Sequence, residues 1–195
     1  MSNNWIIVAV ILIPLVFVIM LYNRLIALRQ SRKNAFSDID VQLKQRFDLI
    51  PQLVETVKGY AGHEKTVFEN ITEARSRVGR AGAGTVGGGS AGAERLQAEG
   101  MLGSALMGLF AVAENYPALK ADQNFLQLQA ELSDIENKIA AARRFFNAAT
   151  NEYNTAVQQF PANLIASMFG FKEEPFFDVG AEEAALIQKA PAVKF

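Results

Sequence analysis

The chain has 195 residues, a length that fits one domain with or without an anchor. It has a formal net charge of -1, one histidine and no cysteine. The absence of cysteine excludes disulfides and thiolate chemistry, and the single histidine, His63, strongly disfavours Ser-His-Asp triads and zinc sites with two histidines. The near-neutral charge argues against a nucleic-acid partner, because such proteins carry an excess of Lys and Arg.

The first predicted element is a membrane span. The run from Trp5 to Tyr22 contains no charged side chain, and at about 1.5 Å per residue it makes about 27 Å of helix, close to the thickness of the bilayer hydrocarbon. Pro14 predicts a kink within it. A cleaved signal peptide is the weaker alternative, because Met1 to Asn4 carries no Lys or Arg and no small-residue cleavage site follows the run.

A basic cluster follows the span and predicts the topology. It consists of Arg24, Arg29, Arg32 and Lys33, with no acidic residue among them. Positive flanks stay on the cytoplasmic side, so we expect the N-terminus outside and the remaining chain in the cytoplasm. The same four residues are candidate contacts to lipid headgroups. The predicted domains are an anchor over 1–23, a cytoplasmic helical domain over 24–160 and a partly ordered tail over 161–195.

Apolar spacing predicts an all-α protein, in which the transmembrane helix continues into a long antiparallel helical hairpin or bundle. From Phe36 to Val78 apolar residues recur three and four apart, and Pro51 predicts a kink without a change of register. A glycine-rich loop is predicted over 79–93. This loop lacks the terminal Gly-Lys-Ser/Thr and the preceding strand of a phosphate-binding loop.

Two further helices are predicted after the loop. The helix over Glu94 to Glu114 is uncharged from Gly100 to Ala113, which favours a buried core helix and leaves an interfacial or re-entrant segment as the alternative. The last helix, from about Asp122 to Phe160, carries a coiled-coil seam for about four heptads and can lie antiparallel along the first.

Polar residues beside these seams are the candidate site. They are Asp38, Asp40, Gln42 and Arg46 on the first helix and Asn137, Arg143, Arg144, Asn147, Asn151 and Asn154 on the last. An interhelical polar network and a solvated face both fit this spacing. No pair of carboxylates is marked as a general acid and base, and His63-Glu64 lacks a second histidine, so no catalytic residue, cofactor or metal ion is predicted.

The order of these segments closely resembles the bacterial LemA family. The similarity covers Tyr22-Asn23, SDIDVQLKQRFDLIPQLVETVKGYAGHE from Ser37 to Glu64, the glycine-rich gap, the stretch from Ala113 to Asn154, and Phe160-Pro161. The resemblance implies a single-pass inner-membrane protein with the N-terminus outside, a cytoplasmic helical domain and no established enzymatic activity. It further implies a role in envelope homeostasis, with an HtpX-type membrane metallopeptidase or a TPM-domain protein as a possible partner. A relative acts in magnetosome membrane formation.

Three functions follow as hypotheses. The first is a non-enzymatic membrane-anchored scaffold that forms a homo-oligomer, because the anchor, the seam and the small-residue helix offer more apolar surface than one hairpin buries. The second is an adaptor or regulatory subunit of a membrane protease or phosphatase, with the acidic, aromatic tail as its docking element. The third, a hydrolase using Asp38, Asp40 and Asp48, has the least support.

Overall fold

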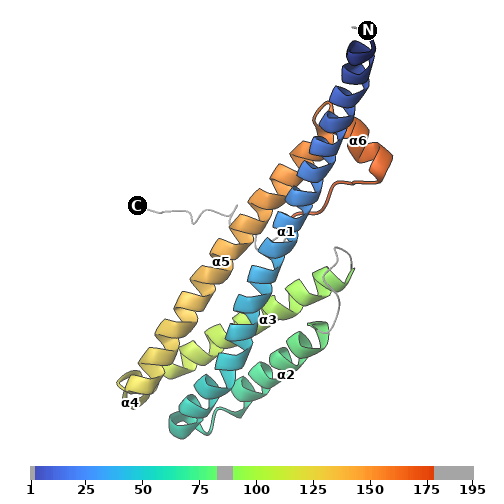
Figure 1. The fold of residues 1–195 in the computed structure, drawn as a ribbon. Helices are drawn as coiled ribbons and strands as arrows, with labels where there is room; N and C mark the ends of the chain where they lie inside the picture. The colour runs from blue at the N-terminus through green and yellow to red at the C-terminus, as the bar shows by residue number, and fades with distance from the viewer. Residues whose placement is uncertain (1–2, 83–89, 178–195) are drawn as a thin grey trace, which may run out of the picture. The chain divides into compact units, whose positions relative to one another are not determined.

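The structure, a computed structural model, describes residues 3–82 and 90–177, and over these residues the protein is all-α. Figure 1 shows its helices: α1 (Asn3–Ala61), α2 (Lys65–Ala81), α3 (Ser90–Ala113), α4 (Pro117–Lys120), α5 (Gln123–Gln158) and α6 (Ala162–Phe169). The predicted fold class is confirmed. The apolar N-terminal segment continues without interruption into the long helix α1, through both Pro14 and Pro51.

The first predicted helix is divided in two, because α1 ends at Ala61 and α2 begins at Lys65. The turn between them closes with the N–H of Glu64 donating to the carbonyl of Ala61 at 3.1 Å. A Cβ at Gly62 would lie 3.3 Å from the carbonyl oxygen of Lys58, so the turn favours a residue without a side chain. The apolar stripe gave no sign of this break because α2 continues to bury its own apolar face.

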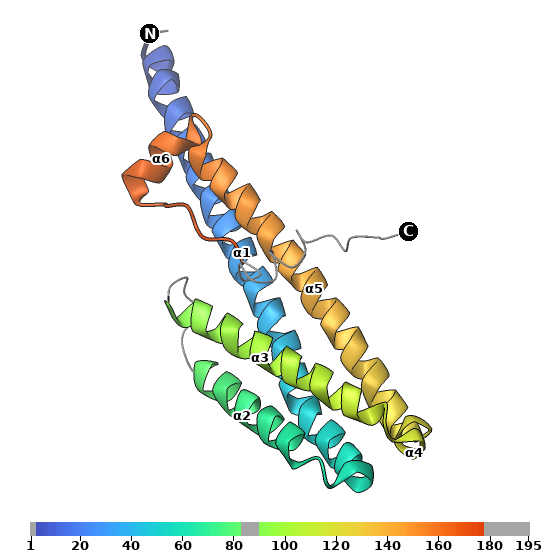
Figure 2. The same cartoon turned by 180° about the vertical axis from the view of Figure 1, so that it is seen from behind.

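Both ends of the range predicted as a glycine-rich loop, 79–93, are helical. Helix α2 includes Gly79 to Ala81 and helix α3 begins at Ser90, while 83–89 lie outside the described residues. Val78 and Ala81 are buried, and α2 lies side by side with α3 in both views (Figures 1 and 2). This packing offsets the cost of about 1 kcal/mol that a glycine imposes on a helix interior.

The chain divides into two compact units. Among the described residues, unit 1 joins 3–41 to 140–177, and unit 2 consists of 42–82 and 90–139. Within each unit α1 and α5 run antiparallel, because later residues of α1 contact earlier residues of α5. The pairs are Arg32–Thr150 and Phe36–Phe146 in unit 1 and Arg46–Glu136 in unit 2, where Tyr60 also contacts Asp122, the residue just before α5.

Each unit has its own apolar core. In unit 2 the uncharged stretch of α3 buries Leu102, Leu106 and Leu109, which lie three or four residues apart on one face of the helix. Buried apolar residues of α1 and α5 in this unit include Ile50, Leu53, Val57, Leu132 and Ile139. In unit 1 the core joins α1, α5, α6 and the residue that follows Gly170, through Leu25, Tyr153, Ala156, Val157, Ile165, Ala166 and Phe171.

Candidate functional site

The N-terminal part of α1 exposes its apolar side chains. These are Val10, Leu12, Ile13, Leu15, Val16, Phe17, Ile19 and Met20. By length and composition this part of α1 is apolar enough to cross a membrane, and only 6% of its apolar window is buried. Glu94–Ala113 meets the same two criteria, with 33% of its window buried in the protein. Because burying one large apolar side chain gains about 1.5–3 kcal/mol, the exposed face of α1 indicates membrane association.

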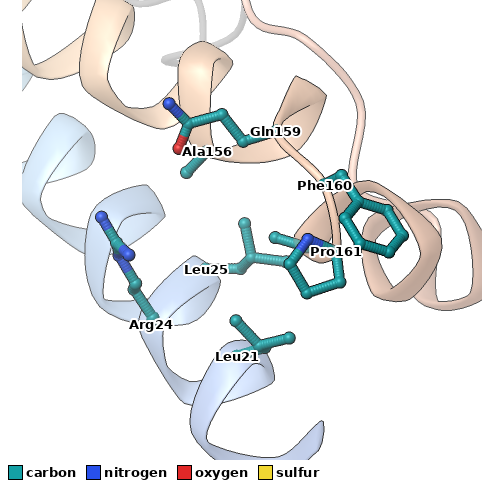
Figure 3. A pocket seen from close by; sticks show the side chains of 8 residues that line it. Leu21, Arg24, Leu25, Ala156, Gln159, Phe160 and Pro161 are labelled. Carbon is teal, nitrogen blue, oxygen red and sulfur yellow. The ribbon is translucent and has the colours of Figure 1, made fainter.

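Helix α6 packs against the end of this apolar segment. The Tyr22 ring meets the rings of Phe169 and Phe171 edge to face, with centroids 4.9 and 5.7 Å apart. Val18 and Leu21 are partly buried against the same cluster. A cleft of about 70 Å³ lies between α1 and the end of α5. Figure 3 shows Leu21 and Leu25 of α1 facing Ala156 and Pro161 around it. The core of unit 1 therefore fixes α6 beside the last residues of the apolar segment.

Gly170 ends α6 and turns the chain back. Its φ of 73° lies in the left-handed region that side chains rarely adopt, and its N–H donates to the carbonyl of Ala166. The N–H of Phe171 donates to the same carbonyl at 2.9 Å, and the Phe171 ring is buried. The chain then continues as a non-helical segment, Lys172–Phe177, which we call the strap.

Two asparagines of α5 hold the strap by its backbone. Asn154 donates from Nδ2 to the carbonyl of Glu174 and accepts at Oδ1 from the N–H of the same residue, both at 2.9 Å. Asn147 forms the same pair of bonds with Phe177, at 3.1 Å to the carbonyl and 2.8 Å from the N–H. The hydroxyl of buried Tyr153 donates to the carbonyl of Lys172 at 3.0 Å, and burial raises the pKa of this hydroxyl.

The spacing of the two asparagines matches the rise of an extended chain. Positions seven apart on a helix share one face and are separated by about 10 Å along the axis. Three residues of extended chain also span about 10 Å. Side chains at 147 and 154 can therefore bind residues 177 and 174 of a chain that runs antiparallel to α5. Because the bonds go to backbone atoms, this geometry does not depend on the strap's side chains.

Arg32 joins the strap to α1 and α5. Its Nε donates to the hydroxyl of buried Thr150 at 3.1 Å, and its Nη2 donates to the carbonyl of Pro175 at 2.9 Å. Its Nη1 lies 3.4 Å from a carboxylate oxygen of Glu174. The guanidinium also stacks 4.8 Å above the Phe146 ring. Burial lowers the pKa of Arg32 and the charge of Glu174 opposes that shift, but a guanidinium remains charged at neutral pH.

Arg46 forms the second polar cluster, in unit 2. Its guanidinium pairs with Glu99 of α3 and, through Nη1 at 2.7 Å, with Glu136 of α5. Arg46 and Glu99 are buried, while Glu136 is half-buried. Although burial opposes the charged form, the hydrogen bonds and charges of Glu136 and Glu99 raise the pKa of Arg46. This cluster links three helices.

The predicted polar candidates thus lie in different environments. Asn147 and Asn154 bind the strap, Arg143 stacks 5.1 Å above the Phe177 ring, and Arg46 binds two acids. The half-buried members are Asp40 and Gln42, and the exposed members are Asp38, Asn137, Arg144 and Asn151. Of the candidate headgroup contacts, Arg24, Arg29 and Lys33 are exposed, whereas Arg32 lies against the strap.

Several residues of these clusters were missed by the sequence analysis. Glu99, Glu136 and Thr150 gave no signal, because their roles depend on which helix faces which. The spacing of the asparagines by seven was a usable signal, although their backbone partners carry no side-chain signature. Within 3–82 and 90–177, no group of three or more His, Asp or Glu residues is placed to hold a metal ion.

The chain is similar in sequence to proteins named MamQ and LemA. The magnetosome protein MamQ of Magnetospirillum gryphiswaldense is 27% identical over 177 residues, covering 82% of this chain and 65% of MamQ. Magnetosome protein MamQ 2 of Paramagnetospirillum magneticum is 26% identical with the same coverage. Protein LemA of Metamycoplasma hominis is 25% identical over 144 residues, covering 74% of this chain and 63% of that protein. The chain therefore spans less than two thirds of the length of these relatives.

The model of the LemA family matches residues 35–195. The match includes α1 from residue 35 to its end, all of α2 to α6, both asparagines that hold the strap, and the strap itself. It begins after the exposed apolar segment of α1 and extends over well more than half of the sequence. On the extent of this match, the chain belongs to the LemA family.

Proposed function

We propose that this protein is a membrane-anchored, non-enzymatic helical scaffold of the bacterial envelope that self-associates. The observation that carries the proposal is the exposed apolar face of α1 between Val10 and Met20, which continues as one helix into the bundle. Because the anchor and part of unit 1 belong to the same helix, the orientation of the anchor in the membrane sets the orientation of unit 1. The names of two relatives as magnetosome proteins fit a role at a membrane.

The proposed topology is a single pass of the inner membrane with the N-terminus outside. Arg24, Arg29 and Lys33 are exposed just after the apolar segment, where each adds about 1 kcal/mol of attraction to an anionic leaflet. Arg32 contributes less to this attraction in our proposal, because its guanidinium is engaged by Glu174, Thr150 and Pro175.

Self-association is supported by apolar side chains that the bundle leaves uncovered. Met101 and Met107 of α3, and Leu126 of α5, are exposed large apolar residues. Single exposed residues of this kind are common, but together with the anchor they offer surface for contact between copies held in one membrane. Concentration in two dimensions favours such contacts even when each is weak.

The anchor is tested by membrane extraction. We expect the protein to remain in the membrane after washing with alkaline carbonate and to be released by detergent. The variant Ile13→Lys/Phe17→Lys, which places charges within the apolar segment, is expected to lose this retention. Phe145→Lys, which changes an equally apolar residue outside the segment, is the matched control and is expected to behave as the natural protein. Release of the natural protein by carbonate would contradict the anchor.

Self-association is tested by light scattering of detergent-solubilised protein over a concentration series. The monomer has a mass of 21.3 kDa, and we expect the protein mass, corrected for detergent, to be a multiple of it. A strict monomer at every concentration would contradict the scaffold proposal.

The alternative is an adaptor or regulatory subunit of a membrane protease or of a TPM-domain protein, with the end of the chain as its docking element. The strap favours it, because α5 holds the tail in a fixed path up to Phe177. Truncation after Phe160 is a poor test, since Ile165, Ala166 and Phe171 belong to the core of unit 1. Truncation after Phe177 retains that core and should abolish co-purification of the partner. Unchanged co-purification would refute this alternative.

A further inference from the structure

Helix α6 has one buried and one exposed apolar face. Ile165 and Ala166 are buried in the core of unit 1. On the outer face Leu164 and Met168, four residues apart, are 59% and 75% exposed. Phe169 at the end of the helix is 53% exposed, and Phe160 in the turn before it is 79% exposed. Gathered apolar side chains of this size mark an interaction surface more often than scattered single ones do.

The position of α6 within unit 1 indicates what covers this face. Its Phe169 packs on Tyr22, and Val18 and Leu21 are partly buried against the same cluster. Ile19 and Met20, in the same part of α1, are exposed apolar residues. Both views show α6 beside this part of α1 (Figures 1 and 2). Helix α6 therefore lies against the end of the anchor, and both elements expose apolar side chains.

The charges around α6 also fit a membrane surface. The helix itself, ANLIASMF, contains no charged residue. Charged residues near its two ends include Arg24, which lines the cleft with Phe160 and Pro161, and Lys172 and Glu173, which follow Gly170 in the sequence. An interfacial helix buries its apolar face at the boundary of headgroups and acyl chains, while charged groups next to it remain among the headgroups.

We propose that α6 is an interfacial membrane helix, with its face of Leu164, Met168 and Phe169, together with Phe160, inserted into the lipid leaflet where the anchor ends. The partner of this face is the bilayer itself, and the inference rests on the proposed anchor. The core residues Ile165 and Phe171 hold α6 against α1, and Asn154 holds the strap that follows it. Because α6 and the anchor belong to one unit, their joint contact with lipid restricts the tilt of α1 where it leaves the membrane.

Single-cysteine labelling tests this proposal on the full chain, which contains no cysteine of its own. The variants Leu164→Cys and Met168→Cys carry an environment-sensitive fluorophore in vesicles of phosphatidylcholine and phosphatidylglycerol. Ile19→Cys, at a residue of the anchor that is 50% exposed, is the positive control. Phe145→Cys, at a residue of α5 in the same unit that is 55% exposed, is the matched negative control. Circular dichroism checks that each labelled protein keeps its helical content.

Lipids with a nitroxide high on the acyl chain quench fluorophores at the membrane boundary. We expect blue-shifted emission and loss of emission at 164 and 168 comparable to those at 19, with no loss at 145. Labels at 164 and 168 that behave like the label at 145, with 19 quenched, would overturn the inference and leave the anchor intact. A blue shift without quenching would overturn it in favour of a protein cover. Absence of quenching at 19 would overturn the anchor, and the inference with it.

Discussion

Arg46 brings carboxylates from two other helices to one buried point of unit 2. Removing a charge from water costs several kcal/mol, and an ion pair offsets that cost only when its geometry is good and its remaining groups are bonded. Because Glu99 is buried with Arg46, each ion depends on the other. We therefore expect the cluster to determine how α1, α3 and α5 are arranged, and to contribute little net stability compared with an apolar replacement.

The variant Arg46→Met should lower the free energy of unfolding by about 3–5 kcal/mol, because it leaves the Glu99 carboxylate buried without a cation. The double variant Arg46→Met/Glu99→Met removes both ions and should recover most of this loss. Urea unfolding of detergent-solubilised protein, followed by circular dichroism, measures both. Arg77→Met, which breaks an exposed pair with Glu73, is the control and should change stability by about 0–1 kcal/mol. Equal stability of Arg46→Met and the control would contradict the buried pair.

Asp122 caps the start of α5 and makes the stability of the protein depend on pH in the acidic range. Its Oδ1 accepts from the N–H of Phe125 and its Oδ2 accepts from the hydroxyl of Tyr60, both at 2.9 Å. The bond from Phe125, followed by that from Tyr60, lowers the pKa of Asp122 below its ordinary value of 3.8. A lowered carboxyl pKa contributes stability that is present above 3.8 and is lost as the pH falls through the folded value.

The variant Asp122→Asn keeps an acceptor for Phe125 but loses the acceptor for the Tyr60 hydroxyl and cannot ionise. At neutral pH we expect it to melt below the natural protein, because the folded state no longer gains from the ionised carboxylate. This difference should shrink below pH 3.8 and disappear below the lowered pKa of folded Asp122, because the natural protein loses the same charge there. Thermal melts followed by circular dichroism at a series of pH values measure it. A difference that stays constant to the lowest pH would contradict an ionised cap.

The residue types in the sequence indicated which positions make polar contacts, but they did not indicate the partners of those contacts. Asn147 and Asn154 stood out as poor helix formers beside an apolar seam, and both bind the strap. Arg32 was grouped with the other basic residues after the anchor because its charge and position match theirs. Its contacts with Pro175 and Glu174, which lie more than 140 positions away, follow from the return of the tail and have no local signal.

Hydrogen bonds between α5 and the strap join side chains of α5 to backbone atoms of the strap. Asn154 satisfies both polar backbone groups of Glu174, and Asn147 does the same for Phe177. Such paired bonds hold a non-helical chain in one register without a sheet. They also fix the chain after Gly170 on α5. Helix α6, which lies between α5 and the strap in the sequence, is therefore fixed at both of its ends.

The variant Asn154→Asp tests this pairing. The carboxylate still accepts from the N–H of Glu174, but it cannot donate to the carbonyl and it adds charge beside the Glu174 side chain. With about 1.5 kcal/mol lost, release of the strap should become roughly ten-fold more frequent. Hydrogen exchange of 172–177, followed by mass spectrometry, measures this release. Asn151→Asp, on an exposed position of the same helix, should leave the exchange unchanged; equal rates in both variants would contradict the clamp.

The long helices were predictable as helices, and the ends of α5 were predicted closely, but other helix ends were not. The seam of α5 predicted a helix from about Asp122 to Phe160, and the structure places it at Gln123–Gln158. By contrast, the turn at Gly62 separates α1 from α2 inside a continuous apolar stripe, because both helices bury the same kind of face. At the glycine-rich stretch, packing of Val78 and Ala81 carries α2 further than glycine content predicts.

At the scale of the whole chain, the apolar residues divide into those that the protein buries and those that it leaves exposed. Position along the sequence predicted this division for α1, where an uncharged run precedes a periodic one. It did not predict α6, because an eight-residue helix next to a proline is too short to show a period. The helix becomes visible only through its contacts with Tyr22 and Leu25. Short elements of this kind depend on tertiary packing for their existence.

The proposed topology gives the last prediction. With single cysteines and a membrane-impermeant maleimide, Asn3→Cys should react in intact spheroplasts, and Phe145→Cys should react only after the membrane is broken. Replacing Arg24, Arg29 and Lys33 by Gln should weaken this bias, because basic residues within about 15–20 positions of a span set its orientation. Arg32 is retained in this variant, since it holds the strap.

The matched control replaces three lysines further from the anchor, Lys44, Lys58 and Lys65, by Gln. This variant has the same total charge as the first, so any effect of net charge on expression or folding is shared between them. Its labelling should remain that of the natural protein, because these lysines lie beyond the range over which charge determines orientation. Reaction of Phe145→Cys in intact spheroplasts would contradict the proposed topology and support the opposite one. It would also place the strap, and the face of α6 beside it, on the outer side of the membrane.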